Sequence, residues 1–331
     1  APLLYAVAWL GLAAWAQASA HAFGGEARLA EADLSGSRFG IWANTLALIR
    51  QQPWTGVGFG EFNLAWTLTP FPGRPVAFFD HTHNLPLHLA VELGLPLAGL
   101  VLGLVLAALW RIARQAWHSA EPASVTQRSA FVMLLLIGLH SLLEYPLWYA
   151  YFLLPTAWLF GYGLGRPAAA PVAVRALGAA SGPLFAGGLL LVLGSALALA
   201  DYGRVVRVFV SPRDGSSLEQ RVDDGRRSRL FAHHASYAAA TTFDTLPATD
   251  AAFAEAPHYL LDTRLMIAWA KALARGGELD KARHLAQRLR EFRNPQAQEF
   301  FAPCDGPEPA DPPPFQCQVP AAAVPWRDFV R

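Results

Sequence analysis

The sequence has few charged residues. Only 15% of its 331 residues are Asp, Glu, Lys or Arg, whereas 53% are hydrophobic. Ordinary soluble domains carry about 25% charged residues, so this composition argues against that class and indicates a membrane protein. The formal net charge is +1, and no run is rich in lysine or arginine. Because nucleic-acid binding requires a basic patch, we expect no nucleic-acid partner.

The start of a secretory signal is also absent. Residue 1 is alanine, and the sequence opens inside an apolar segment without the positively charged region that precedes the core of a signal peptide. We therefore expect the chain to be the C-terminal part of a longer protein, with further membrane helices before residue 1.

Apolar windows recur along the first 200 residues. A helix needs about 20 apolar residues to cross a hydrocarbon core of about 30 Å. Arg111, Arg114 and Arg128 flank one connection between windows, and Arg166 and Arg175 flank another. By the positive-inside rule these connections are cytoplasmic, so the segment before residue 84 and the tail after residue 200 lie on the opposite side. The expected spans are 3–20, 84–109, 124–145, 147–164 and 184–200.

Two regions, 21–83 and 201–331, contain no window that could span a membrane. Glycine, proline and charge break up the first, and the second is more polar throughout. The sequence therefore predicts an all-α protein. Residues 1–200 form a polytopic membrane helix bundle with about five spans and a long periplasmic loop at 21–83. Residues 201–331 form a periplasmic helical domain.

Helical periodicity outside the spans is clearest in three stretches: Ser37–Arg50, Ser228–Thr242 and Leu260–Phe292. The first has apolar residues at positions 39, 42, 46 and 49, which predicts an amphipathic helix against the membrane or the bundle. The last resembles one tetratricopeptide unit, with Gly276 and Gly277 at its turn. Because one unit cannot form a solenoid, we expect a short helical domain packed on the membrane part.

Polar side chains gather in the stretch Phe78–Pro96, FFDHTHNLPLHLAVELGLP, at the start of an apolar window. Polar groups at membrane depth cost about 2.5 to 3.5 kcal/mol when charged, so they are usually kept for a task or satisfied by a partner. Asn84 can cap the helix that follows, and Pro86 suits its first turn.

His81 and His83 first suggest a metal site beside Asp80. The sequence has no H-E-x-x-H or C-x-x-C motif and no third histidine at a standard spacing, so we expect no metal. A second interpretation is that His83, close to the positive end of a helix, stays neutral and acts as a general base. Alternatively, both histidines bond only to loop backbone. Asp80 either orients a histidine or caps a turn.

Two histidine–glutamate pairs have helical spacing. His88 and Glu92 follow Asn84 at i+4 and i+8 and so share one helical face. Glu92 either positions a substrate or forms a structural pair with His88. His140 and Glu144 are also four residues apart, and either face the same cavity as Glu92 or form a buried structural pair.

Arginines before the histidines are candidates for phosphate binding. Arg38 and Arg50 bound the first amphipathic stretch, and Arg74 lies in the proline-rich approach to His81. A guanidinium group keeps its charge and binds phosphate in a bidentate fork. The alternative is that each arginine is a solvated surface residue.

The run Gly56–Phe62, GVGFGEF, is rich in glycine. It does not match a dinucleotide fingerprint, and it lacks the Lys-Ser/Thr of a phosphate loop. We expect these glycines to let backbone segments approach closely.

Only two cysteines are present, Cys304 and Cys317, and both lie near proline-rich sequence in the tail. As a pair they would close a loop of about a dozen residues, which suits an oxidising compartment and a terminus without its own core. Two free buried thiols are the alternative. Paired cysteines agree with a periplasmic tail.

Several of these blocks together resemble the O-antigen ligase and polymerase superfamily: GSRFGIWANTLALIRQQPWTGVGFGEF and HTHNLPLHLAVELGLP. Later blocks resemble its branch of pilin-glycosylation ligases, which are bacterial protein O-oligosaccharyltransferases. These blocks are HSLLEYPLWYAYFLLP, LDTRLMIAWAKALARGGELDKARHLAQRLREF and the ending FQC…PWRDF.

The resemblance implies a multi-pass glycosyltransferase of the bacterial inner membrane with a periplasmic active site. It would transfer an oligosaccharide from undecaprenyl pyrophosphate to Ser or Thr hydroxyls of a periplasmic or pilin-like protein. The family's histidine corresponds to His83 and its loop arginine to Arg38. No cofactor is implied. The partners would be the lipid-linked glycan, the acceptor and membrane lipids.

In the expected mechanism, His83 takes the proton of the acceptor hydroxyl, and Arg38 stabilises the departing pyrophosphate. Arg74 and the helix end at Asn84 would assist. The residues expected to bind substrate are Arg74, Asn84, His81, Glu92 and Glu144.

Alternatives are an O-antigen ligase acting on lipid A-core, an O-antigen polymerase, and, from another class, a membrane scaffold or transporter. A transporter should show interrupted helices or inverted repeats, and the sequence shows neither. A scaffold has no need of a His-Asn cluster.

Overall fold

The computed structural model describes residues 38–118, 123–165, 174–210, 215–243, 251–306 and 311–330. These residues form helices and no strands, which confirms the predicted all-α class. The predicted span at 3–20 and Arg166 lie outside the described residues.

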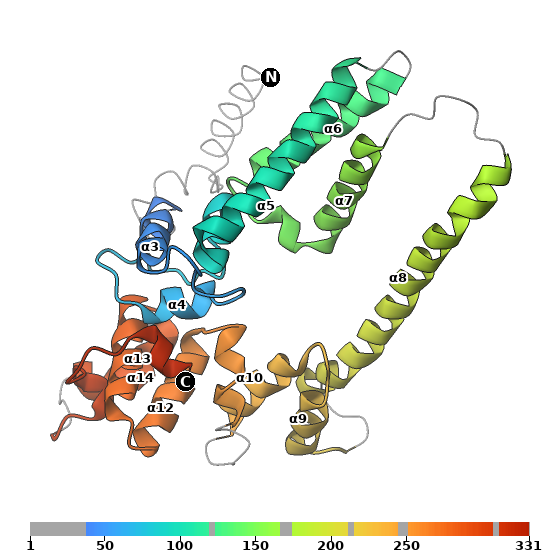
Figure 1. The fold of residues 1–331 in the computed structure, drawn as a ribbon. Coiled ribbons are helices and arrows are strands. Elements are labelled where there is room, and N and C mark those ends of the chain that lie inside the picture. Colours follow the sequence, from blue (N-terminus) through green and yellow to red (C-terminus); the bar gives the residue numbers. More distant parts are fainter. Residues whose placement is uncertain are drawn as a thin grey trace, which may run out of the picture.

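Three apolar helices lie side by side: α5 (Leu85–His118), α6 (Ala123–His140) and α7 (Ala150–Leu164) (Figure 1). A small core joins them, made by Ile112, Ala130, Leu134 and Leu159. The long helix α8 (Val174–Phe209) leads from this group to the C-terminal helices. Two helices of the described chain, Leu85–His118 and Phe185–Phe209, are long and apolar enough to cross a membrane, and Val125–His140 is a shorter apolar helix.

The predicted spans differ from these helices at their ends. α6 stops at His140, because a turn at 141–144 and the 3₁₀ helix η2 (Pro146–Trp148) take the place of the predicted helix to residue 145. α5 extends past Leu109 to His118. α8 runs through the predicted domain boundary at residue 200, and Val205 and Val208 near its end are buried.

Helix α5 is interrupted at Gly94, which has φ +77° and ψ 163°, and this interruption was not predicted from the sequence. The following Pro96 has no N–H to donate to the carbonyl of Glu92. That carbonyl instead accepts from the N–H of Gly58 at 3.1 Å, and the carbonyl of Val91 accepts from Val57 at 2.8 Å. Backbone of the segment before α4 therefore packs into the break in α5.

Close backbone approach requires glycine at this break. A Cβ atom on Gly94 would lie 2.2 Å from the carbonyl oxygen of Trp54, and one on Gly56 would lie 2.4 Å from that of Glu92. Within the run Gly56–Phe62, Gly56 therefore has the packing role predicted from sequence, whereas no atom would lie within 4 Å of a Cβ on Gly60.

We predict that Gly94→Ala strongly lowers the melting temperature of the protein. The change puts a side chain at φ +77° and ψ 163°, a backbone region that is essentially restricted to glycine and costs about 1 to 3 kcal/mol, and it adds an overpacking cost of about 1 to 3 kcal/mol. Gly73→Ala is the control for positive φ: Gly73 has φ +71°, and no atom would lie within 4 Å of a Cβ added there, so the overpacking cost is absent. Equal melting temperatures for the two variants would contradict the packing role.

The segment before α5 folds into two helices, α3 (Arg38–Gln51) and α4 (Phe62–Leu68). α3 confirms the predicted helix, but the predicted apolar face is only partly correct: Phe39 and Leu46 are exposed, and Ile41 and Leu48 are buried. The helix has apolar residues on two sides, and the protein covers the side of Ile41. α4 was not recognised in the sequence, and all seven of its residues are buried.

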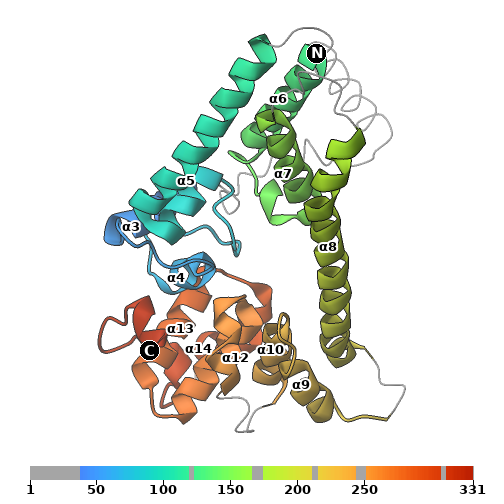
Figure 2. The ribbon, with the colours of Figure 1, turned by 45° about the vertical axis from the view of Figure 1, so that its right-hand side comes forward.

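The C-terminal helices pack beneath α4, as Figures 1 and 2 show. Helices α12 and α13 form the predicted hairpin, with Gly277 at φ +82° in its turn. α10 confirms the predicted helix but begins at Ala232 and not at Ser228. One hydrophobic core extends from α3 and α4 into these helices. The elements of this part are α9 (Leu218–Arg226), α10 (Ala232–Thr242), η3 (Ala256–His258), α12 (Thr263–Arg275), α13 (Leu279–Glu291), η4 (Pro295–Ala297), α14 (Gln298–Asp305), η5 (Phe315–Cys317) and η6 (Trp326–Phe329).

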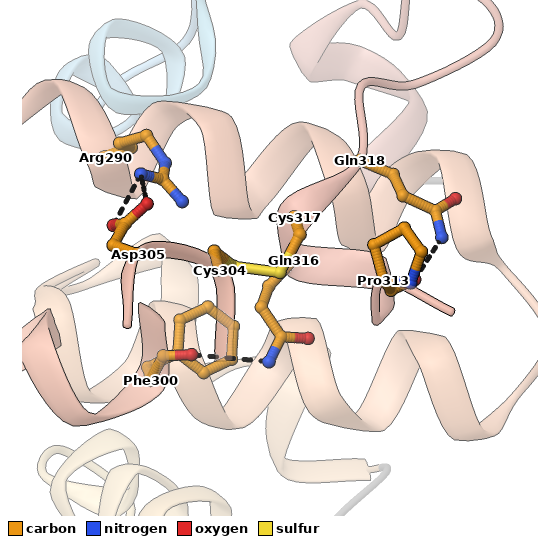
Figure 3. The surroundings of a disulfide bond; sticks show 8 residues. All are labelled: Arg290, Phe300, Cys304, Asp305, Pro313, Gln316, Cys317 and Gln318. Carbon is orange, nitrogen blue, oxygen red and sulfur yellow. Dashed lines mark hydrogen bonds and ion pairs between the residues drawn. A yellow bond between two sulfur atoms is a disulfide. The ribbon is translucent and has the colours of Figure 1, made fainter. Parts of the chain in front are cut away.

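The structure contains the predicted disulfide between Cys304 of α14 and Cys317 of η5 (Figure 3). The amide of Gln316 donates to the carbonyl of Phe300 at 3.3 Å beside it. Closing a loop with a sequence separation of 13 residues stabilises the fold by about 3 kcal/mol in the chain-entropy description. The disulfide thus fastens a segment of short helical turns to α14.

Candidate active site

His83 occupies a tight turn immediately before α5. Its φ is +52°, a left-handed conformation that costs a residue with a side chain about 1 to 2 kcal/mol. The neighbours hold this turn: the hydroxyl of Thr82 donates to the carbonyl of Asn84 at 2.8 Å, and the indole of Trp42 donates to the carbonyl of Thr82 at 2.9 Å. Helix α3 therefore helps to fix the backbone of His83.

Asn84 caps α5 as predicted, because its side-chain oxygen accepts from the N–H of Leu87 at 3.0 Å. Its amide group also donates to the carbonyl of Leu142 at 3.1 Å, and the N–H of Leu85 donates to the carbonyl of Ser141 at 2.8 Å. Two hydrogen bonds thus attach the turn after α6 to the start of α5. They bring Glu144 to His83.

Glu144 joins the two residues that the sequence analysis assigned to catalysis. Its Oε2 atom lies 2.8 Å from Nδ1 of His83, and its Oε1 atom accepts a hydrogen bond from Nη2 of Arg38. The cluster is partly open to solvent, with His83 the least exposed of the three side chains. Arg38, His83 and Glu144 are called the triad cluster below.

The geometry of the triad cluster favours one tautomer of His83. When Nδ1–H donates to the carboxylate of Glu144, the other ring nitrogen, Nε2, is unprotonated and can accept a proton. Nε2 has no hydrogen-bond partner among the described residues, and the ring edge contacts Tyr145 at 4.9 Å between centroids. A carboxylate behind a histidine also stabilises the imidazolium that proton transfer creates.

His81 belongs to a different set of contacts. Its Nδ1 atom lies 3.0 Å from Asp80, and its ring stacks on Tyr145 at 4.5 Å. The contact with His81 lowers the pKa of the Asp80 carboxyl below its ordinary value. His81 and His83 thus have separate carboxylate partners. In the parts of the chain that the structure describes, no group of three or more metal-ligating side chains occurs.

His88 and Glu92 lie buried below the turn, on the face of α5 that the sequence predicted. Nε2 of His88 is 3.4 Å from Glu92, whose carboxylate also accepts from the N–H of Phe62 at 3.4 Å. The pair with His88 is the structural alternative stated for Glu92. The contact with Phe62 also links α5 to α4.

The second predicted pair does not form. The ring of His140 lies 5.8 Å from the ring of Phe152, between centroids. Glu144 pairs instead with His83 and Arg38, and it does not line the cavity that contains Glu92. The spacing prediction assumed one continuous helix, and α6 ends at His140.

Arg74 is placed away from the triad cluster. Its side chain is 2% exposed and pairs with Glu291 of α13 at 2.9 Å. The guanidinium group lies over Trp66 at 4.7 Å and Phe292 at 5.0 Å, and burial lowers its pKa to about 10. Arg74 holds α13 against α4, so the structure gives no support to its predicted role in substrate binding.

Sequence reasoning missed an open pocket of about 740 Å³ beside His81. The C-terminal region contributes part of its wall. There His258 contacts Glu61, which lies 197 residues earlier in the sequence. No local motif indicates such a contact. The lining residues are Phe59, Gly60, Glu61, Asn63, Asp80, His81, His88, Glu92, Trp148, Ala254, Glu255, His258 and Tyr259.

The contact between Glu61 and His258 depends on pH. Nδ1 of His258 lies 2.7 Å from Glu61, and this hydrogen bond raises the pKa of His258 above 6.5. A raised pKa means that the contact contributes its full stability below about pH 6.5 and loses it as the pH rises through the pKa of the folded state.

We predict that His258→Gln lowers the melting temperature by about 2 °C at pH 5.5, as expected for a partly exposed ion pair worth about 0.5 to 1 kcal/mol. The difference from the wild type should disappear at pH 8.5. His234→Gln, which removes an exposed histidine of α10, is the control and should show no such trend. A constant effect of His258→Gln at both pH values would contradict the ion pair.

Fold and site together define an all-helical protein with helices long enough to cross a membrane and a histidine–glutamate–arginine cluster at the start of one of them. The chain belongs to the family described as virulence factor membrane-bound polymerase, C-terminal, which matches residues 128–301. Residues 1–102 match the family described as O-antigen ligase. The protein is therefore a membrane protein of the O-antigen ligase and polymerase superfamily, as the resemblance predicted.

Two curated relatives come from Acinetobacter baylyi (strain ATCC 33305 / BD413 / ADP1). The chain is 36% identical to a general O-oligosaccharyltransferase over 124 residues, which are 38% of this chain and 21% of the relative. It is 29% identical to a ComP-specific O-oligosaccharyltransferase over 133 residues, which are 39% of this chain and 23% of the relative. The matched segment thus spans about a fifth of each relative's length. No solved structure matches the chain.

Proposed function

We propose that the protein is a glycosyltransferase of the bacterial inner membrane. It transfers an oligosaccharide from undecaprenyl pyrophosphate to a Ser or Thr hydroxyl of a periplasmic or pilin-like protein. The observation that carries this proposal is the position of Glu144 between His83 and Arg38, which combines a proton acceptor with a phosphate-binding cation. The similarity to two O-oligosaccharyltransferases supports the choice of a protein as acceptor.

In the proposed reaction, the acceptor hydroxyl gives its proton to Nε2 of His83 while its oxygen attacks the anomeric carbon. The bond between that carbon and the pyrophosphate oxygen breaks, and its electron pair leaves with the pyrophosphate. Direct displacement inverts the anomeric centre. Glu144 holds His83 in the tautomer that can accept the proton and stabilises the resulting imidazolium.

Arg38 stabilises the negative charge that grows on the leaving pyrophosphate. Only Nη2 of its guanidinium group is paired with Glu144, and Arg38 has no other hydrogen bond within the described ranges. The remaining N–H groups are therefore free to bind phosphate oxygens in the bidentate manner of arginine.

The start of α5 contributes position and not charge stabilisation. The N–H of Leu85 donates to Ser141, the N–H of Leu87 donates to Asn84, and Pro86 has none. Because these N–H groups already have partners, they are not available to pyrophosphate. In the proposed mechanism Asn84 therefore caps the helix, and the helix end does not stabilise pyrophosphate as was expected from the sequence.

The direction of the chain in the membrane supports a periplasmic site. Arg111 and Arg114 lie near the C-terminal end of α5, and Arg128 lies near the start of α6, whereas His83 precedes the opposite end of α5. Figure 1 shows α3, α4 and the C-terminal helices at this opposite end. By the positive-inside rule, the triad cluster and the tail then face the periplasm.

The test is to express the complete gene with a supply of lipid-linked glycan and two alternative acceptors, a pilin-like protein and lipid A-core. We expect the pilin-like acceptor protein to gain the mass of the glycan on Ser or Thr. Modification of lipid A-core alone would identify an O-antigen ligase, and elongation of the lipid-linked glycan would identify a polymerase. If neither acceptor nor donor changes, the proposed activity is wrong.

A further inference from the structure

The pocket beside His81 is built from segments distant in the sequence. The loop before α4 supplies Glu61, the segment before α5 supplies Asp80 and His81, and the last residue of η2 supplies the ring of Trp148. The tail closes the pocket with Glu255 and the segment from η3 to Tyr259. Its volume of about 740 Å³ falls within the range of about 300 to 1,000 Å³ that is usual for small-ligand sites.

The charge of the lining disfavours phosphate. Four carboxylates line the pocket, those of Glu61, Asp80, Glu92 and Glu255, beside three histidines, and none of the described residues lining it is lysine or arginine. Carboxylates accept hydrogen bonds and so suit a ligand with many hydroxyl groups. They repel a pyrophosphate group, which finds its cation outside the pocket at Arg38.

Three buried polar atoms in the lining have no hydrogen-bond partner among the described residues. They are Nδ1 of His88, Oε2 of Glu61 and Nδ1 of His81, which has only the charge of Asp80 beside it at 3.0 Å. The His88 side chain is only 5% exposed. Buried polar atoms are nearly always hydrogen-bonded, so these atoms indicate that a polar ligand completes the site.

Aromatic rings form the open part of the wall. Trp148 is 43% exposed and Tyr259 is 58% exposed, although both are large apolar side chains. The ring of Tyr259 is held in place by stacking on His233 at 3.9 Å. Pockets that combine such rings with a few polar groups bind ligands that have both an apolar face and polar edges. A pyranose ring has this character.

Two aromatic rings connect the pocket with the triad cluster. His81 lines the pocket and stacks on Tyr145, and the ring of Tyr145 contacts His83 at 4.9 Å. A ligand that extends from the pocket past these two rings can therefore reach the proposed base. A pyrophosphate attached to a sugar in the pocket can then lie toward Arg38.

We propose that this pocket binds the sugar attached to the pyrophosphate, and that Tyr259 and Glu255 of the tail are specificity-determining contacts for it. This inference rests on the proposed function. An acceptor peptide is a weaker fit, because an extended chain needs a groove with backbone partners, whereas the lining of this pocket consists of side chains that suit a sugar.

The test measures steady-state transfer by the complete enzyme, with a polyprenyl pyrophosphate carrying one or two sugars as the donor and a Ser-containing acceptor protein. Tyr259→Ala should raise the KM for the donor roughly tenfold, since an aromatic contact is worth about 1.4 kcal/mol. Its kcat and the KM for the acceptor should stay within about twofold. Glu255→Gln should raise the donor KM in the same way, because an amide oxygen is a weaker acceptor than a carboxylate for a sugar hydroxyl. Glutamine can still accept the hydrogen bond that Ser236 donates at 2.6 Å, so the fold should be kept.

Two controls keep the outcome decisive. Tyr202→Ala removes an exposed tyrosine of α8 that does not line the pocket, and it should leave both KM values unchanged. Melting temperatures separate lost binding from lost folding. Tyr259→Phe keeps the ring and should behave like the wild type. If Tyr259→Ala folds poorly, the donor KM of Glu255→Gln decides the test. A rise in the acceptor KM alone would assign the pocket to the acceptor and overturn the proposal, as would unchanged constants. A wild-type enzyme that transfers nothing would instead overturn the proposed function.

Discussion

His83→Ala in the complete enzyme should lower the rate of glycan transfer by about 10²- to 10⁴-fold, the usual contribution of a positioned general base. Nε2 of His83 is the unpaired imidazole nitrogen of the triad cluster among the described contacts, and no other described histidine has Glu144 as its partner. The rate is measured with purified enzyme at saturating donor, so that a change in donor affinity does not hide the loss in kcat.

His140→Ala is the matched control for this loss. His140 lies at the end of α6, four residues before Glu144, but contacts Phe152 and not the triad cluster. We expect its replacement to change the rate by less than about twofold. If His83→Ala and His140→Ala were equally active, His83 would not be the base. If both were inactive with lowered melting temperatures, the loss would reflect folding.

Glu144→Gln should reduce kcat by about 10²-fold or more, although glutamine is nearly the same size as glutamate. The carboxylate fixes the tautomer of His83 and balances the positive charge that forms on it, and loss of such a partner costs up to about 10⁴-fold where it has been measured in hydrolases. Glu144→Asp keeps the charge on a shorter side chain and should recover part of the rate.

A double-mutant cycle separates positioning from a general structural role. If Glu144 acts through His83, then Glu144→Gln should have little further effect in an enzyme that already carries His83→Ala, because residues that act as a unit are not additive. Full additivity of the two losses would mean that Glu144 acts independently of His83. The pairing of Glu144 with Nδ1 of His83 at 2.8 Å predicts non-additivity.

The parts of the site that the sequence predicted are those set by local chemistry. Asn84 before an apolar window predicts a helix cap, and the structure has that cap. Gly276 and Gly277 between two amphipathic stretches predict the turn between α12 and α13. In each case the residues that determine the structure are neighbours in the chain.

Contacts between distant segments gave no such signal. The contact of Glu144 with His83 requires α6 to end at His140, and that end is stabilised by hydrogen bonds from Asn84 and Leu85 across the bundle. Arg74 shows the same difficulty, because nothing near it in sequence indicates that Glu291 would bury it. Charge and loop position suggested a phosphate ligand, and tertiary packing produced a structural ion pair.

Burial of α4 also has a consequence for the order in which the enzyme matures. All seven residues of α4 are buried, and much of its cover is synthesised late: the carbonyl of Leu68 accepts from His284, and the side chain of Asn63 accepts from the N–H of Leu261, across 216 and 198 residues. During synthesis, α4 therefore leaves the ribosome well before the residues that cover it. With the proposed function and topology, the nascent chain should stay inactive until the hairpin of α12 and α13 has been exported and has docked on α4.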